Sequence, residues 1–183
     1  MAPPPTPRER PSAAIHVCPL RLVPATVAAT GARHLLSVIN QQQIPPTPAG
    51  IAPDDHLRIA VNDIAVPQDG LVHPSSRHID AIVAFARRWN HTGPVVVHCL
   101  AGISRSTAAT FIMLCDLNPK SPEAWIAAQI RAASPTAMPN ALMIELADQV
   151  LGRRGRMIAA IQALAPAGPA MEGIPFALPA DLD

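Results

Sequence analysis

The sequence contains no tyrosine, and aromatic residues make up only 3% of its 183 residues. No tyrosine can therefore serve as a catalytic phenol or as a recognition platform. The formal net charge is +1 and no run of lysine or arginine occurs, so neither a nucleic acid nor an acidic membrane is indicated as the main partner. The longest apolar stretches, such as residues 108–115, are far shorter than the roughly 18 residues of a membrane-spanning helix.

Cysteine is also scarce. The three cysteines, Cys18, Cys99 and Cys115, are odd in number and widely spaced, which argues against a disulfide framework. Neither C-x-x-C nor H-E-x-x-H occurs and the seven histidines are scattered, so we expect no metal site and no cofactor. Cys18 and Cys115 are expected in the core, although either could form a protective disulfide with Cys99 under oxidation.

The two ends of the chain are rich in proline and alanine. Residues 1–12 are predicted to be a disordered arm, and no apolar segment follows them as a secretory signal would require. Residues 165–183 are predicted to be a loosely ordered Ala/Pro-rich tail. Between them, we expect residues 13–164 to form one domain of a cytoplasmic protein, and the sequence leaves its oligomeric state open.

Short apolar runs alternate with helical patterns along this domain. Strands are predicted at residues 15–18, 34–40, 57–62 and 95–99, and helices at residues 23–32, 74–89, 104–116, 121–133 and 139–152. The alternation predicts an α/β three-layer sandwich, with a central, mostly parallel sheet of four or five strands and helices on both faces.

One stretch, V-V-V-H-C-L-A-G-I-S-R-S at residues 95–106, carries the chemistry. Its valines predict a buried strand that ends at Cys99, on the carboxyl edge where α/β sheets bind ligands. We call residues 99–105 the signature loop. Its backbone N–H groups can form an anion-binding nest, and Gly102 permits the tight turn that such a nest needs. The predicted phosphate-binding residues are Leu100, Ala101, Gly102, Ile103, Ser104 and Arg105.

The position of Cys99 in the signature loop predicts that its thiol is a nucleophile. A thiol at a helix N-terminus ionises more readily than a free one, so Cys99 can attack at neutral pH. The guanidinium of Arg105 suits two oxygens of a phosphate. Ser106 can hydrogen-bond the sulfur and help it leave when a thiophosphate is hydrolysed. A buried structural thiol is the common alternative for a free cysteine, but the residues around Cys99 favour catalysis.

The stretch H-C-L-A-G-I-S-R-S matches the H-C-x-x-G-x-x-R-[S/T] signature of the protein tyrosine phosphatase superfamily. The wider layout resembles the dual-specificity branch, which has a strand ending in aspartate and a helix before the signature, then a buried helix, a helix with an arginine, a Pro-Asn pair and a final helix. The corresponding segments here are residues 57–63, 98–106, 127–131, 139–140 and 146–156. The resemblance covers about residues 15–157 and implies that residues 13–164 are a phosphatase-like catalytic domain.

The resemblance also implies roles for individual residues in a CX5R mechanism without metal. Cys99 attacks phosphorus, while Arg105 and the loop amides bind the non-bridging oxygens. Asp63 protonates the leaving oxygen and then activates the water that releases phosphate, with Asp69 as the competing candidate. The segment from residue 64 to residue 74 could move over the site like a lid.

Three further residues are predicted to support the signature loop. His98 is expected to orient the segment that carries the nucleophile. Arg131 could line the phosphate site or brace the loop from behind, and we favour bracing. Asn140 is expected to cap a helix.

The sequence indicates the substrate less specifically than it indicates the reaction. Family members that act on inositol phospholipids often carry lysines at the variable loop positions, and this loop has none. A phosphoprotein is therefore the expected partner, with phosphotyrosine before phosphoserine or phosphothreonine. The alternatives are a phosphatase-like module that binds without turnover, a phosphoinositide phosphatase, and an enzyme that uses the same loop on another oxyanion, as arsenate reductases and sulfur transferases do.

Overall fold

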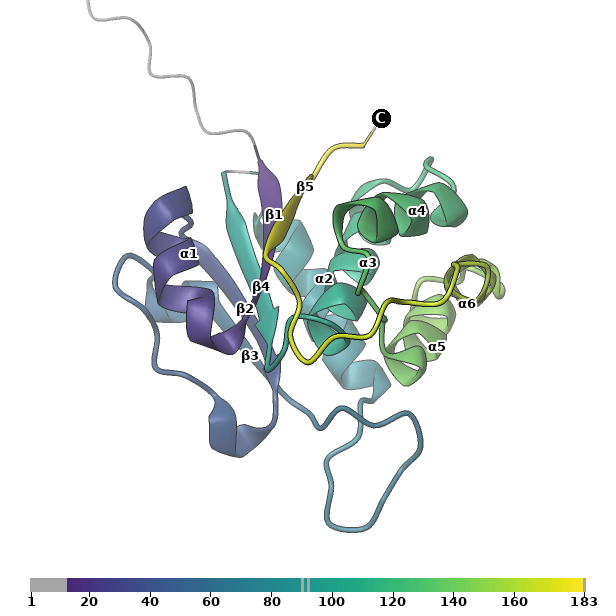
Figure 1. Cartoon of the computed structure of the whole chain (residues 1–183), viewed down its shortest axis with the longest axis horizontal. Helices are drawn as coiled ribbons and strands as arrows, with labels where there is room; N and C mark the ends of the chain where they lie inside the picture. Colours follow the sequence, from purple (N-terminus) through teal and green to yellow (C-terminus); the bar gives the residue numbers. More distant parts are fainter. Residues whose placement is uncertain (1–12, 90, 92, 183) are drawn as a thin grey trace, which may run out of the picture.

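The computed structural model describes residues 13–89, 91 and 93–182. Its centre is a five-stranded sheet with the order β3-β2-β4-β1-β5 (Figure 1). The strands are β1 (Ala14–Pro19), β2 (His34–Ile39), β3 (His56–Ala60), β4 (Val95–Cys99) and β5 (Phe176–Pro179). The first four pair in parallel and β5 pairs antiparallel with β1. Parallel strands need long crossovers. Helices supply those from β1 to β2 and from β3 to β4, whereas residues 40–55 join β2 to β3 with two short 3₁₀ turns.

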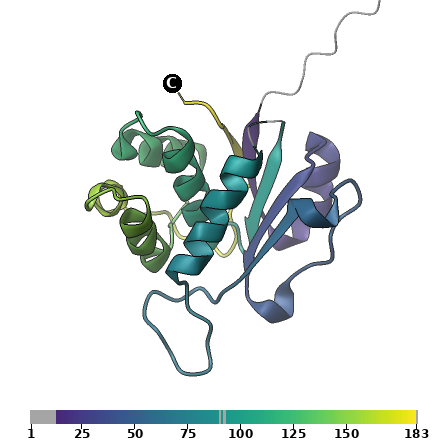
Figure 2. The same ribbon diagram turned by 180° about the vertical axis from the view of Figure 1, so that it is seen from behind.

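Helices cover both faces of this sheet, as Figures 1 and 2 show. Helix α1 (Val23–Thr30) lies on one face. The other face carries α2 (Ser76–Trp89), α3 (Arg105–Leu117), α4 (Glu123–Ala133), α5 (Ala141–Val150) and α6 (Arg156–Gln162). The predicted α/β sandwich with a mostly parallel sheet is therefore confirmed.

Burial on both faces of the sheet explains why β4 begins with an unbroken run of apolar residues. Val95 and Val97 pack with α2 and α3 in the larger core, whereas Val96 joins a smaller core beneath α1. All three valines are fully buried, and burial of each such side chain contributes about 1.5–3 kcal/mol. Strand β4 is thus held from both faces, which fixes the position of the loop that follows it.

Two elements at the C-terminal end differ from the prediction. The expectation of a loosely ordered tail is wrong for residues 176–179, which form β5 along the open edge of β1. The helix predicted over residues 139–152 is found as α5, but a further helix, α6, follows it that was not predicted. Gly152 and Gly155 separate the two, because both adopt left-handed backbone conformations with φ of 63° and 85°. The predicted arm at residues 1–12 lies outside the described residues.

Each helix within the described ranges is too short or too polar to cross a bilayer.

Candidate active site

The signature loop connects the carboxyl end of β4 to the first turn of α3 and contacts three other segments of the chain. The carbonyl oxygens of Leu100, Ala101 and Ile103 accept hydrogen bonds from three backbone N–H groups at 3.1, 2.8 and 2.9 Å. The donors are Leu20, Gly173 and Met138, respectively. These bonds hold the carbonyls outward, and the N–H groups of the same peptides point the opposite way.

The thiol of Cys99 lies at the base of this loop and is 1% exposed. The backbone N–H of Gly102 donates to Sγ at 3.2 Å, and the hydroxyl of Ser106 lies 3.2 Å from the same sulfur. Gly102 has a φ of 73°, and a Cβ there would lie 3.0 Å from the backbone nitrogen of Pro19. Only glycine fits both constraints, as the sequence predicted.

Arg105 is 5% exposed although it carries a full charge. One terminal nitrogen donates to the carbonyl of Val61 at 2.8 Å. Its Nε has no hydrogen-bond partner among residues 13–89, 91 and 93–182, and lies 3.6 Å from Oδ2 of Asp63. A buried donor without a partner is costly, so this nitrogen is available for a ligand.

Asp63 is held against the signature loop by two hydrogen bonds to Oδ1. Ser104 donates its hydroxyl at 2.7 Å and Asn140 donates its amide at 2.9 Å. Asn140 also accepts from the N–H of Met143 at 3.0 Å and so caps α5. The structure thus places the first-choice acid beside both the loop and Arg105, with the side chain 36% exposed.

The competing acid lies farther along the same loop. Asn62 and Val72 close its neck, because Asn62 N donates to Val72 O at 2.7 Å and Val72 N donates to Asn62 Oδ1 at 3.0 Å. Asp69 is exposed near the turn at Gly70, while Asp63 is the first residue within the neck. Figures 1 and 2 show this loop, between β3 and α2, projecting away from the sheet.

His98 lies behind the signature loop and is fully buried. Its Nδ1 is 3.1 Å from the carbonyl oxygen of Cys99, and its Nε2 is 2.6 Å from the hydroxyl of Ser37. Burial is the main reason that the pKa of His98 is lowered to about 4; the hydrogen bond to the Cys99 carbonyl opposes this shift, and the charge of Arg105 adds to it. His98 is therefore a neutral imidazole at physiological pH.

Arg131 and the two other cysteines lie outside this arrangement. Arg131 donates to the carbonyls of Pro135 and Ala137 at 3.2 and 2.7 Å, in the segment whose Met138 contacts the signature loop. Cys18 and Cys115 are buried, and burial raises the pKa of Cys18 to about 11 and that of Cys115 as well. Both are therefore protonated thiols at neutral pH.

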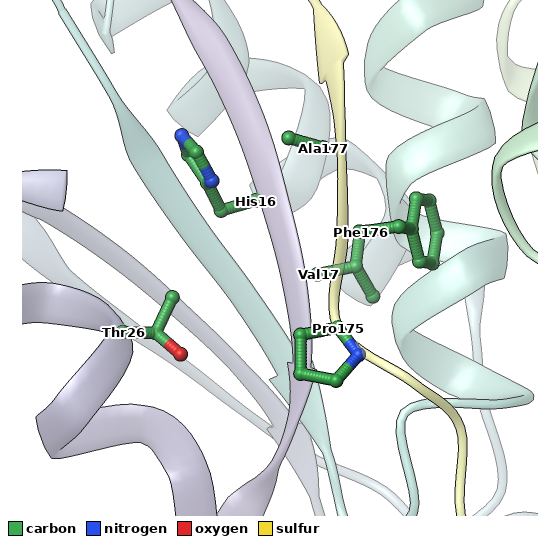
Figure 3. A pocket seen from close by; sticks show the side chains of 6 residues that line it. All are labelled: His16, Val17, Thr26, Pro175, Phe176 and Ala177. Atoms are coloured by element: carbon green, nitrogen blue, oxygen red, sulfur yellow. The ribbon is translucent and has the colours of Figure 1, made fainter. Parts of the chain in front are cut away.

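A pocket of about 250 Å³ lies where α1 faces β1 and the start of β5 (Figure 3). Its lining residues are His16, Val17, Thr26, Pro175, Phe176 and Ala177. None of these six belongs to the signature loop, so we assign the pocket no part in the site. Over the described ranges, no group of three or more His, Cys, Asp or Glu side chains is arranged to hold a metal ion.

Sequence reasoning did not find every contact of the site. The bonds from Ser104 and Asn140 to Asp63, and that from Ser37 to His98, join segments far apart in the chain. One signal was available, because Ser37 is a lone hydroxyl within the apolar run L-L-S-V-I, and a buried polar group needs a partner.

Comparison with known proteins gives a family match for one segment and shared folds among solved structures. The sequence model of the protein-tyrosine phosphatase family matches residues 63–133. No curated protein matches the sequence. Among solved structures, human DUSP28 shares 23% identity with a TM-score of 0.61, covering 84% of this chain and 98% of its own. DUSP15 shares 18% identity with a TM-score of 0.58, covering 82% of this chain and 92% of its own. PTPMT1 in complex with PI(5)P shares 19% identity with a TM-score of 0.55, covering 79% of this chain and 97% of its own. The predicted resemblance to the protein tyrosine phosphatase superfamily is confirmed over residues 63–133, and the solved structures of DUSP28 and DUSP15 share the fold of this chain.

Proposed function

We propose, from this fold and this arrangement of residues, that the chain is a cysteine-dependent phosphatase. It hydrolyses phosphomonoesters through a cysteinyl-phosphate intermediate on Cys99. Its substrate, on this proposal, is a phosphotyrosine side chain of a protein.

One observation carries the proposal: a thiol and a guanidinium N–H that has no hydrogen-bond partner within the described ranges lie at the same end of the sheet. Sγ of Cys99 receives the N–H of Gly102 at the N-terminus of α3, where the helix dipole favours negative charge. Nε of Arg105 is buried and has no hydrogen-bond partner within the described ranges. A phosphate oxygen would satisfy that donor by a charge-assisted hydrogen bond.

The reaction would proceed in two steps. The Cys99 thiolate attacks phosphorus, the bond from phosphorus to the leaving oxygen breaks, and Asp63 protonates that oxygen. A water molecule then attacks phosphorus, Asp63 accepts its proton, and the S–P bond breaks to restore the thiolate. The hydrogen bond from Ser106 stabilises the sulfur as it leaves, and Arg105 with the loop amides stabilises the oxygens in both transition states.

The surroundings of the loop favour an aromatic phosphoester over a multiply charged head group. The variable loop positions carry no charge. Exposed apolar side chains lie on the signature loop or next to residues hydrogen-bonded to it: Leu100 is in the loop, the N–H of Met138 bonds the loop, and Ile174 follows Gly173, which also bonds it. Such a surface suits a tyrosine ring and its neighbouring residues.

Hydrolysis of p-nitrophenyl phosphate tests the enzyme, and a substrate panel tests its preference. Cys99→Ser should abolish turnover, whereas Cys115→Ser, a matched change of a buried cysteine away from the loop, should retain it. The panel compares a phosphotyrosine peptide, a phosphothreonine peptide and a phosphoinositide, because PTPMT1 was solved with PI(5)P. If the wild-type protein binds phosphopeptides but hydrolyses none of these substrates, the chain is a binding module and not an enzyme.

A further inference from the structure

Three buried polar side chains form a row across the α1 face of the sheet. His56 lies on β3, Ser37 on β2 and His98 on β4, and they are 4%, 0% and 0% exposed. Ser37 and His98 are opposite each other in register. The hydroxyl of Ser37 lies 2.8 Å from Nε2 of His56 and 2.6 Å from Nε2 of His98. One hydroxyl thus joins two imidazoles.

The row extends at both ends. At the inner end, Nδ1 of His98 lies 3.1 Å from the carbonyl oxygen of Cys99. At the outer end, Nδ1 of His56 lies 3.0 Å from the hydroxyl of Thr47, in the segment between β2 and β3. The side chain of Arg58 donates to that same hydroxyl. A continuous chain of hydrogen bonds therefore connects the surface to the residue that carries the thiol.

The donor and acceptor at each step are determined. A carbonyl oxygen only accepts, so the proton of neutral His98 is on Nδ1 and its Nε2 accepts from Ser37. Ser37 has one proton, which it uses there, so it must accept from Nε2–H of His56. Nδ1 of His56 is then an acceptor, which the Thr47 hydroxyl satisfies. Every donor in the chain points toward the Cys99 carbonyl.

This pattern requires both imidazoles to be neutral, and their surroundings favour that state. Burial, with smaller contributions from the charges of Arg58 and of a protonated His98, lowers the pKa of His56 to about 4. Burial and, to a smaller extent, the charge of Arg105 also lower the pKa of His98 to about 4, against the raising effect of its hydrogen bond to the Cys99 carbonyl.

We infer that Ser37 and His56 are positioning residues for Cys99, acting through His98. The chain fixes the tautomer and orientation of His98, whose Nδ1–H then holds the carbonyl of Cys99. That carbonyl and the N–H of Leu100 belong to one peptide plane and point in opposite directions. Fixing one fixes the other, so the chain sets the direction of the first amide of the signature loop. The inference goes beyond the proposed function but concerns the same thiol.

The first experiment uses the alkylation of Cys99 by iodoacetamide as a function of pH, with the modified peptide identified by mass spectrometry. Ser37→Ala should move the alkylation midpoint up by about 0.7 pH unit, equivalent to about fivefold slower reaction below it, since one net hydrogen bond is lost. Thr110→Val is the matched control, because it removes a buried hydroxyl that has no hydrogen-bond partner within the part of the chain that is described. Equal midpoints in the two variants would overturn the inference.

The second experiment tests the direction of the chain. The side-chain amide of glutamine can donate from nearly the position of Nε2, whereas that of asparagine is too short. His56→Gln should therefore keep a wild-type midpoint and His56→Asn should behave like Ser37→Ala. Ring ¹⁵N shifts should show the proton on Nδ1 of His98 and on Nε2 of His56, and the opposite tautomers would refute the assignment. Neither readout requires turnover, so an inactive protein would refute the proposed function and leave this inference to its own test.

Discussion

Acid should destabilise this protein through the two histidines that are joined by Ser37. Both are buried as neutral imidazoles, and burial lowers the pKa of His56 and of His98 from 6.5 to about 4. Between these two values the unfolded chain binds more protons than the folded one, so stability falls as pH falls. The loss begins near the unfolded value of 6.5 and is complete near pH 4, below which both states are protonated.

The size of the effect follows from the same shift. For a pKa of 6.5 in the unfolded state and about 4 in the folded state, lowering the pH from 7 to 5 costs about 2 kcal/mol for each histidine. The two together should account for about 3–4 kcal/mol, a large share of the 5–15 kcal/mol by which a typical domain is stable.

Urea unfolding at pH 7 and at pH 5 measures this loss. His56→Gln keeps a donor toward Ser37 but cannot titrate, so its pH-dependent loss should be about 2 kcal/mol smaller than that of the wild type. His73→Gln, at an exposed position outside the hydrogen-bond chain, is the matched control and should keep the full loss. If the free energy of unfolding of His56→Gln falls from pH 7 to pH 5 by as much as that of the wild type, His56 is not held neutral by the fold and the reasoning fails.

The remaining predictions concern the acid and the packing of the loop. With an aryl phosphate of poor leaving ability, Asp63→Asn should remove the basic limb of the pH–rate profile and Asp69→Asn should not; the reverse would exchange their roles. Asn140→Ser keeps a helix cap but cannot reach Asp63, so kcat should fall about tenfold with little change in the thermal midpoint, and an unchanged kcat would contradict that contact. Gly173→Ala should lower both activity and stability, because its Cβ would lie 2.9 Å from a carbonyl oxygen of the signature loop, whereas Gly168→Ala in the same tail meets nothing within 4 Å and should be silent in both assays.

Much of the fold could be predicted because its strands are buried on both faces. Val95, Val96 and Val97 form a continuous apolar run for that reason, and the regular spacing of apolar residues in α2 marks its buried side. Strand β5 has only four residues, two of them Pro179 and the partly buried Phe176, so no period is visible. It exists because β1 offers an open edge, which is a property of the assembled sheet.

Part of the site could likewise be predicted from local sequence, and part of it could not. Cys99, Gly102, Arg105 and Ser106 are close in sequence, so their spacing alone predicted a phosphate cradle. The partners of Asp63 and of His98 are set by the register of neighbouring strands and by the position of α5. A single sequence does not contain that register, and local patterns therefore could not supply those contacts.

The most direct test of the central claim is to trap the covalent intermediate. In Asp63→Asn, an aryl phosphate with a good leaving group should still phosphorylate the enzyme, while the water attack that needs a base is slowed. Rapid quenching at neutral pH followed by peptide mapping should then find phosphate on Cys99, and none when Cys99→Ser is added. Phosphate on another residue, or undiminished turnover in Cys99→Ser, would contradict the account.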